Sequence, residues 1–256
     1  MAKKIKFIFV GKDDKFSFTD ENMSKFYQEH PEYTEDVQFY KIPNNKENLT
    51  KIYNNELRIE RADKTNDFLV FLHADVLLDF DHLIKHMIEC EEKYDIMGLC
   101  GCQKISISQS PLNWFTGSIP YLDFRWGCVT HGELENHMSF FSQNRSEIKD
   151  SNVACIDGLC IIFTRKALES EIEFDEQFAF DFYDTDISFQ ALMKYNLRLG
   201  VIVEESLKHY SVGRSILTKE FLTHEVDFRK KWNFEIPKNS PINRLLQEDK
   251  NEPKLV

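Results

Sequence analysis

Imidazole and carboxylate side chains, which bind ligands and move protons, gather at three places in this sequence. His73 and Asp75 directly follow the apolar run 68–72, a group of aspartates lies at 175–186, and His209 comes later. The run 68–72 predicts a central strand buried on both faces of a parallel sheet. Because ligands of open α/β sheets bind beyond the carboxyl ends of the strands, we expect His73 and Asp75 to face a ligand site. The alternative is that they cap the following helix.

The group at 175–186 contains four carboxylates. They are Asp175, Asp181, Asp184 and Asp186. Asp184 or Asp186 is placed to be the N-cap of a helix that holds Ile187 and the apolar residues after it. Capping accounts for one carboxylate and does not require four, so the group also indicates a functional site.

Asp157 and Gly158 interrupt the apolar segment 153–163. A hairpin turn explains them poorly, because the sequence after them is not polar. We therefore interpret Gly158 as a position where the backbone closely approaches a ligand.

The turn after the first predicted strand, with Gly11, Lys12 and Asp13, also faces the ligand crevice of such a sheet. Its backbone and carboxylates are candidates for contact with a nucleotide. A single glycine does not make a G-x-G-x-x-G cradle, and no Ser or Thr follows Lys12. The sequence therefore supports neither a dinucleotide-binding fingerprint nor a P-loop.

Strands and helices alternate in the predicted order of elements. Strands are predicted at 5–10, 37–42, 68–72, 96–102 and 199–203, and helices at 48–62, 80–88, 165–171 and 218–232. The β-α-β-α-β series at the start favours a right-handed, parallel α/β sheet. Periodicity fades at 103–150, which predicts a loop region over the active face. Its aromatic rings are candidates for stacking on a sugar or a lipid-linked group, or for a small aromatic core.

Composition limits the partners of the protein. The chain has 256 residues, enough for one sizeable core without disulfide or metal support. Its formal charge of −11, from 32 Lys and Arg against 43 Asp and Glu, argues against a nucleic-acid partner. No apolar segment approaches the roughly 20 residues of a membrane span. We expect a soluble, cytoplasmic protein, and the sequence leaves its oligomeric state open.

The cysteines and the histidine pair at 82 and 86 are candidates for metal binding, but other interpretations are favoured. The six cysteines show no Cys-x-x-Cys spacing and are interpreted as reduced, mostly buried thiols. Cys100 and Cys102 are considered as a metal pair, which is the less favoured interpretation. His82 and His86 lie one helical turn apart, a spacing that can bind zinc, but without the glutamate of a metalloprotease. We interpret both as solvated helix residues.

The order of these signals resembles a known family. The motifs in chain order are His73-Ala74-Asp75, Asp157-Gly158, Asp175-Glu176-x-Phe178, Tyr183-Asp184-x-Asp186, and His209 with Gly213-Arg214-Ser215. With these motifs the chain resembles family 2 glycosyltransferases of the GT-A fold, and its segment 71–76 looks most like the branch related to the streptomycin-biosynthesis protein StrF. The resemblance implies a Rossmann-like, mostly parallel sheet flanked by helices. Its domain would span 1–215, with a variable acceptor-side loop region at 103–150, and a C-terminal helix and tail would follow at 216–256.

The resemblance also implies roles for individual residues. Asp75 corresponds to the last residue of the D-x-D element, which holds Mn²⁺ or Mg²⁺ on the donor diphosphate, and His73 stands in place of the first Asp. By the same similarity His209 completes the metal shell. Asp184 corresponds to the catalytic base, with Asp186 as the alternative. The residues expected at the donor are Gly11, Lys12, Asp13, His73, Asp157, Gly158 and Arg214.

The implied activity is metal-dependent, inverting transfer of a sugar from a nucleotide-sugar donor to a hydroxyl acceptor, which is a glycan, a lipid-linked group or a small molecule. A non-catalytic nucleotide-sugar or glycan-binding protein of the same fold is the alternative, because the first Asp of D-x-D is missing. A nucleotidyltransferase is less favoured, because the chain has no Gly-rich, basic phosphate loop near its N-terminus. The donor nucleotide stays open.

Overall fold

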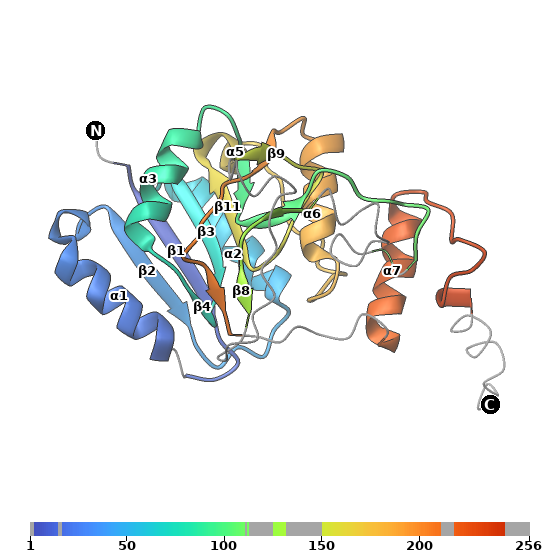
Figure 1. The fold of residues 1–256 in the computed structure, drawn as a ribbon, viewed down its shortest axis with the longest axis horizontal. Coiled ribbons are helices and arrows are strands. Elements are labelled where there is room, and N and C mark those ends of the chain that lie inside the picture. The colour runs from blue at the N-terminus through green and yellow to red at the C-terminus, as the bar shows by residue number, and fades with distance from the viewer. Residues whose placement is uncertain are drawn as a thin grey trace.

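A seven-stranded sheet forms the centre of the computed structural model, which describes residues 3–14, 17–110, 112, 125–131, 150–210 and 218–243. The strands lie in the order β2 (Val37–Ile42), β1 (Ile5–Val10), β3 (Phe68–His73), β11 (Cys160–Thr164), β5 (Ile96–Gly98), β12 (Leu199–Val201) and β9 (Ser151–Asn152). β11 and β9 run antiparallel to their neighbours, and the other strands are parallel to one another. The expected mostly parallel α/β sheet is therefore confirmed (Figure 1).

β3 is enclosed on both faces, as its sequence predicts. All residues from 68 to 72 have no exposed surface. Leu69 and Phe71 belong to the core on one face of the sheet, and Val70 and Leu72 belong to the core on the other. Since successive side chains of a strand point to opposite faces, a strand buried in this way must be apolar throughout.

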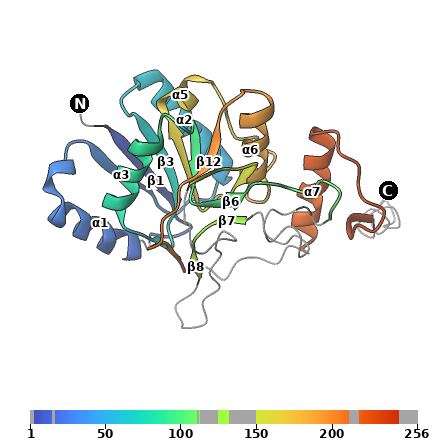
Figure 2. The same ribbon diagram turned by 45° about the horizontal axis from the view of Figure 1, so that its top comes forward.

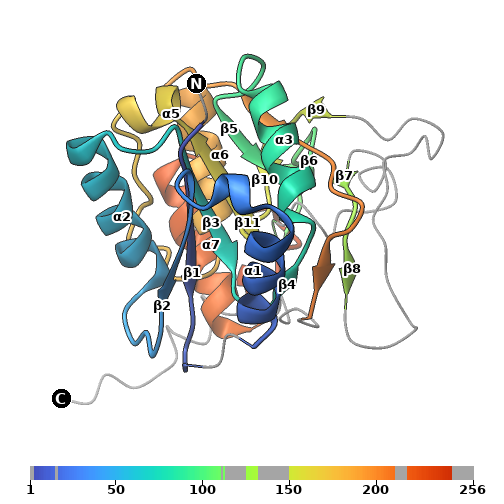
Figure 3. The same cartoon turned by 90° about the vertical axis from the view of Figure 1, so that its left-hand side faces the viewer.

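Helices cover both faces of the sheet (Figure 3). One face is covered by α1 (Ser17–Glu29) and α3 (Phe80–Cys90), and the other core takes in α2 (Leu49–Asp63), α5 (Arg165–Glu169), α6 (Tyr183–Met193) and α7 (Lys219–Lys231). A 3₁₀ turn, η1 (Pro31–Tyr33), follows α1. Tyr53 and Leu57, one turn apart on α2, are both buried, which is the spacing that predicted this helix. None of the described helices is both long and apolar enough to span a bilayer.

Two small sheets adjoin the central one (Figure 2). One contains β10 (Cys155–Ile156), β6 (Cys100–Cys102) and β7 (Arg125–Gly127), and the other contains β4 (Val76–Leu77), β13 (Lys208–His209) and β8 (Thr130–His131). The prediction of a single strand at 96–102 was wrong, because the chain leaves the central sheet after Gly98 and enters the β6 sheet. All six cysteines are free and buried, as expected. Most of the loop region predicted at 103–150 lies outside the described residues.

Candidate active site

The carboxyl ends of β1, β2 and β3 meet at one edge of the central sheet. Val10 is in register with Ile42 on one side and with His73 on the other. The turn after β1 is fixed there, because the Gly11 N–H donates to the Ile42 carbonyl over 3.0 Å and the Asn45 N–H donates to the Gly11 carbonyl over 2.8 Å. The predicted donor residues of this turn therefore lie beside the end of β3, and Lys12 and Asp13 are exposed to solvent there.

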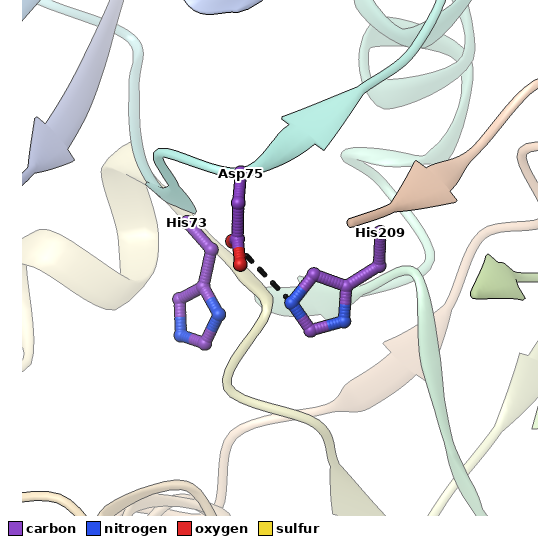
Figure 4. A group of neighbouring side chains, drawn as sticks. All are labelled: His73, Asp75 and His209. Carbon is purple, nitrogen blue, oxygen red and sulfur yellow. Dashed lines mark ion pairs between the residues drawn. The ribbon is translucent and has the colours of Figure 1, made fainter. Parts of the chain in front are cut away.

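His73, Asp75 and His209 converge just beyond this edge (Figure 4). Their potential ligand atoms all lie within 4.8 Å of one another. His209 Nε2 is 3.4 Å from Asp75 Oδ1, and the rings of His73 and His209 are 5.7 Å apart between centroids. The pairing of β4 with β13 brings the distant His209 here, because it puts His209 opposite Val76, the residue after Asp75.

The electrostatics of this cluster suit metal binding. Burial acts to raise the pKa of Asp75, but the hydrogen bond and charge of His209 and the charge of His73 outweigh it, so the pKa is lowered. Burial and the nearby His209 lower the pKa of His73, against the opposing charges of Asp75 and Asp157. These shifts favour an ionised Asp75 and a neutral His73, the protonation states in which these side chains bind a cation. Two imidazoles beside one carboxylate fit Mn²⁺ better than Mg²⁺, which prefers oxygen ligands.

Tyr183, which the sequence analysis did not assign to the site, orients His73. Its hydroxyl donates to the Gly158 carbonyl over 3.0 Å and lies 3.2 Å from His73 Nε2. The phenol has a single proton, and when it is donated to the Gly158 carbonyl, His73 Nε2 is the donor to the Tyr183 oxygen. His73 Nδ1 then keeps the lone pair that binds a metal. A partner of this kind on the second ring nitrogen is typical of metal-binding histidines. The sequence signal that could have identified Tyr183 is its place at the start of the motif Tyr183-Asp184-x-Asp186.

The contact with Tyr183 explains why position 158 is a glycine. A Cβ atom at this position would lie 1.9 Å from the Tyr183 hydroxyl oxygen, so any larger residue would displace that ring. The close approach predicted for Gly158 is therefore an approach to Tyr183, whereas the sequence analysis assigned it to a ligand. The N–H of Gly158 has a second use, because it donates to Asp184 Oδ2 over 3.1 Å.

Asp184 combines partial burial with a raised pKa. Its Oδ1 accepts from the Thr185 N–H at 2.6 Å and from the Thr185 hydroxyl at 3.3 Å. Burial and the negative charge of Asp157 raise the pKa of Asp184 to about 7, although the hydrogen bonds from Thr185 and Gly158 oppose the shift. Asp157 acts on the pKa of both Asp184 and His73, so its carboxylate links the two parts of the site.

Asp186 lies in the same helical turn but in a closed environment. Its side chain has no exposed surface and accepts from Lys231 Nζ at 2.7 Å and from Trp232 Nε1 at 2.9 Å. The N-cap of α6 is Phe182, at a φ of 69° and without a side-chain hydrogen bond, so the prediction that Asp184 or Asp186 caps this helix was wrong. The remaining donor prediction, Arg214, lies outside the described residues.

Solved structures similar to this one define the fold class. The crystal structure of GalNAc-T7 with UDP, GalNAc and Mn²⁺ has a TM-score of 0.51 and 10% identity, over 88% of this chain and 48% of that chain. This chain thus spans about half the length of that structure. A197 from STIV gives a TM-score of 0.46 and 16% identity, over 81% of this chain and 86% of that chain. The fold is that of GT-A glycosyltransferases.

A family model identifies the chain more closely. The model described as "Glycosyltransferase like family" matches residues 19–229, and the chain belongs to this family. Membership of this family supports sugar transfer as the general activity. They do not support the narrower resemblance to the StrF branch. No curated protein matches this sequence.

Proposed function

We propose that this protein is a metal-dependent glycosyltransferase that moves a sugar from a nucleotide-sugar donor to a hydroxyl acceptor, with inversion at the anomeric carbon. The convergence of His73, Asp75 and His209 beyond the carboxyl edge of the sheet carries the proposal. This edge is where open α/β sheets bind nucleotides. The acceptor would be a glycan, a lipid-linked group or a small molecule.

The three converging side chains would hold a divalent cation, with Mn²⁺ favoured over Mg²⁺. Such an ion, when bound, offsets the negative charge that a nucleoside diphosphate gains as it leaves. His73 takes the place of the first Asp of the D-x-D element and is oriented by Tyr183. Because an imidazole is itself a metal ligand, the substitution is compatible with a working site. This argues against the alternative of a fold that has lost its activity.

Asp184 is the proposed general base. Its carboxylate would take the proton of the acceptor hydroxyl as the new glycosidic bond forms, a step worth about 10²–10⁴-fold in rate. A base acts best when its pKa lies near the working pH, and the pKa of Asp184 is raised to about 7. Asp157 would contribute by its charge, and Gly158 by the hydrogen bond that positions the base.

Donor binding would use residues at the ends of β1 and β3. Gly11, Lys12 and Asp13 lie beside His73 at the same edge and are proposed to contact the nucleotide. Arg214 is proposed to contact the diphosphate, since its planar guanidinium suits bidentate phosphate binding.

A ligand-stabilisation experiment tests the proposal. The melting temperature would be measured with UDP-, GDP- and dTDP-sugars, with and without Mn²⁺, in the wild type, in Asp75→Ala and in the control Asp63→Asn. Asp63 is exposed at the C-terminal end of α2. We expect Mn²⁺-dependent stabilisation by at least one sugar nucleotide in the wild type and the control, and none in Asp75→Ala.

Release of nucleoside diphosphate from the stabilising donor then separates an enzyme from a binding protein. Stabilisation without any release would support the non-catalytic alternative. If no sugar nucleotide stabilises the wild type, the proposed function is wrong. If Asp75→Ala keeps the full metal-dependent stabilisation, the metal site is misplaced.

A further inference from the structure

A second group of metal-binding side chains lies at the C-terminal half of α3. His86 and Cys90 are one turn apart on this helix, and Asp150 directly precedes the edge strand β9. His86 Nε2 is 2.8 Å from Asp150 Oδ1, and Cys90 Sγ is 3.1 Å from Asp150 Oδ2. The potential ligand atoms of the three residues all lie within 4.8 Å of one another. None of them belongs to the proposed active site.

The fold holds these three residues in place. Residues four apart on a helix share one face, so His86 and Cys90 point together toward the sheet edge. Cys90 is 1% exposed, and Asp150 Oδ1 also accepts from the Val203 N–H at 3.3 Å, beyond the end of β12. The side chains of His86 and Asp150 are 20% and 16% exposed, so an ion can reach the cluster from solvent.

His82 and His86 have different surroundings, which corrects the interpretation of both as solvated. The His82 side chain is 58% exposed and pairs with Glu204 through its Nδ1, at 2.5 Å from Oε2. His86 is largely covered and pairs with Asp150. His82 is therefore engaged with Glu204, and the group of potential metal ligands around His86 does not include it. His86 instead lies beside the Cys90 thiol, one turn later on the helix, and the Asp150 carboxylate at the sheet edge.

A thiol, an imidazole and a carboxylate form a donor set with a definite preference. Zn²⁺ binds cysteine sulfur, histidine nitrogen and carboxylate oxygen in tetrahedral geometry, and thiolate ligands disfavour Mg²⁺ and Ca²⁺. Without a metal, the Cys90 thiol carries its proton, which it donates to Asp150 Oδ2. Binding of the ion would release that proton to solvent as sulfur becomes a ligand, with no change in oxidation state.

We propose that His86, Cys90 and Asp150 bind Zn²⁺, with water as the fourth ligand, and that the ion ties the C-terminal half of α3 to the edge of the sheet. The site would stabilise the fold independently of sugar transfer. It differs from the group of His73, Asp75 and His209 in one testable respect, because it contains a cysteine and the other does not.

Cobalt spectroscopy detects this difference. Co²⁺ replaces Zn²⁺ in tetrahedral sites, and a bound thiolate adds a charge-transfer band in the near ultraviolet. Metal-free wild-type protein should develop this band and saturate at about one equivalent of Co²⁺ for the thiolate site. Asp75→Ala, which disables the other cluster, and Cys102→Ser, which removes a different buried thiol, should both keep the band.

Variants of the proposed zinc ligands should lose the charge-transfer band or bind Co²⁺ more weakly. Cys90→Ser should abolish the band, and His86→Gln should weaken Co²⁺ binding at least about tenfold, since even loss of an outer-shell partner costs a metal site that much. His86 is partly exposed, so this variant tests the site if Cys90→Ser does not fold. A wild type without the band, a band that survives in folded Cys90→Ser, or His86→Gln with unchanged affinity would each overturn the proposal.

Zn²⁺ should also raise the melting temperature of Asp75→Ala, and should not raise that of Asp75→Ala combined with His86→Gln. Neither the Co²⁺ spectrum nor the melting temperature with Zn²⁺ requires a sugar nucleotide. A failure of this proposal can therefore be told apart from a failure of the proposed function.

Discussion

The first turn of α6 carries two carboxylates that lie two residues apart in opposite surroundings. Asp184 accepts hydrogen bonds from Gly158 and Thr185, while the negative charge of Asp157 acts to raise its pKa. Asp186 faces α7, where Lys231 Nζ lies 2.7 Å away. Asp184 thus lies near a like charge, that of Asp157, and Asp186 is paired with a cation, Lys231.

This difference supports different proposed roles for Asp184 and Asp186. A half-buried carboxylate under the influence of a like charge binds a proton more tightly, which costs stability and gives a base suited to neutral pH. A carboxylate paired with lysine in the interior fixes two elements together, here α6 and α7. Lys231 also binds Asp175 at 2.7 Å, so one cation joins two of the four aspartates that drew attention in the sequence.

The largest expected effect is on turnover in Asp184→Asn. The amide keeps the shape of the side chain but has a single oxygen for the N–H groups of Gly158 and Thr185, and it cannot take a proton from the acceptor. We expect the rate of transfer at saturating donor to fall by about 10²–10⁴-fold. Stabilisation by donor nucleotide and Mn²⁺ should be unchanged, because the side chain is not among the metal-binding residues. Transfer would be measured as nucleoside diphosphate released in the presence of acceptor.

The control for this variant is Asp63→Asn, which removes one exposed carboxylate from α2. It should transfer sugar at the wild-type rate. Wild-type turnover in Asp184→Asn would remove Asp184 as the base and make Asp157, the neighbouring carboxylate, the next residue to substitute.

A smaller effect, on stability, is expected in Asp186→Asn. The variant removes a charge that has no exposed surface and leaves Lys231 with Asp175 as its remaining carboxylate partner. Hydrogen bonds to charged groups are worth about 1.5–3 kcal/mol, and we expect the free energy of unfolding in urea to fall by about that amount. Turnover per folded molecule should stay within about tenfold of wild type. Loss of turnover at unchanged stability would instead identify Asp186 as the base.

The position of His73 and Asp75 at the end of a buried strand could be predicted because its signals are local. The apolar run 68–72 indicates a buried strand by itself, and a strand end places His73 and Asp75. The roles of Asp184 and Asp186 could not be separated in that way. The lysine that neutralises Asp186 comes from α7, and no periodicity links it to α6.

Long-range contacts explain the other differences as well. Asp150 lies far from His86 in sequence and reaches it only through the position of β9 at the sheet edge. The left-handed conformation of Phe182, at a φ of 69°, starts α6 without a polar cap, against the usual preference for Ser, Thr, Asp or Asn. Its ring packs against Phe221 and Phe228 of α7, so tertiary packing replaces the capping signal on which the sequence prediction relied.

The last expected effect is a pH-dependent gain of stability in Asp184→Asn. In the unfolded chain the pKa of an aspartate is about 3.9, and in the folded protein the pKa of Asp184 is raised to about 7. The folded state therefore binds this proton more tightly, and the resulting stability is fully present below about pH 4 and lost as pH rises through about 7. Asparagine does not titrate, so the variant escapes this loss. In urea unfolding of metal-free protein, the stability of Asp184→Asn relative to wild type should rise with pH between about pH 5 and about pH 8. The same measurement on Asp63→Asn shows the effect of removing one exposed charge. If the stability of Asp184→Asn relative to wild type depends on pH no more than that of Asp63→Asn, the pKa of Asp184 is not raised.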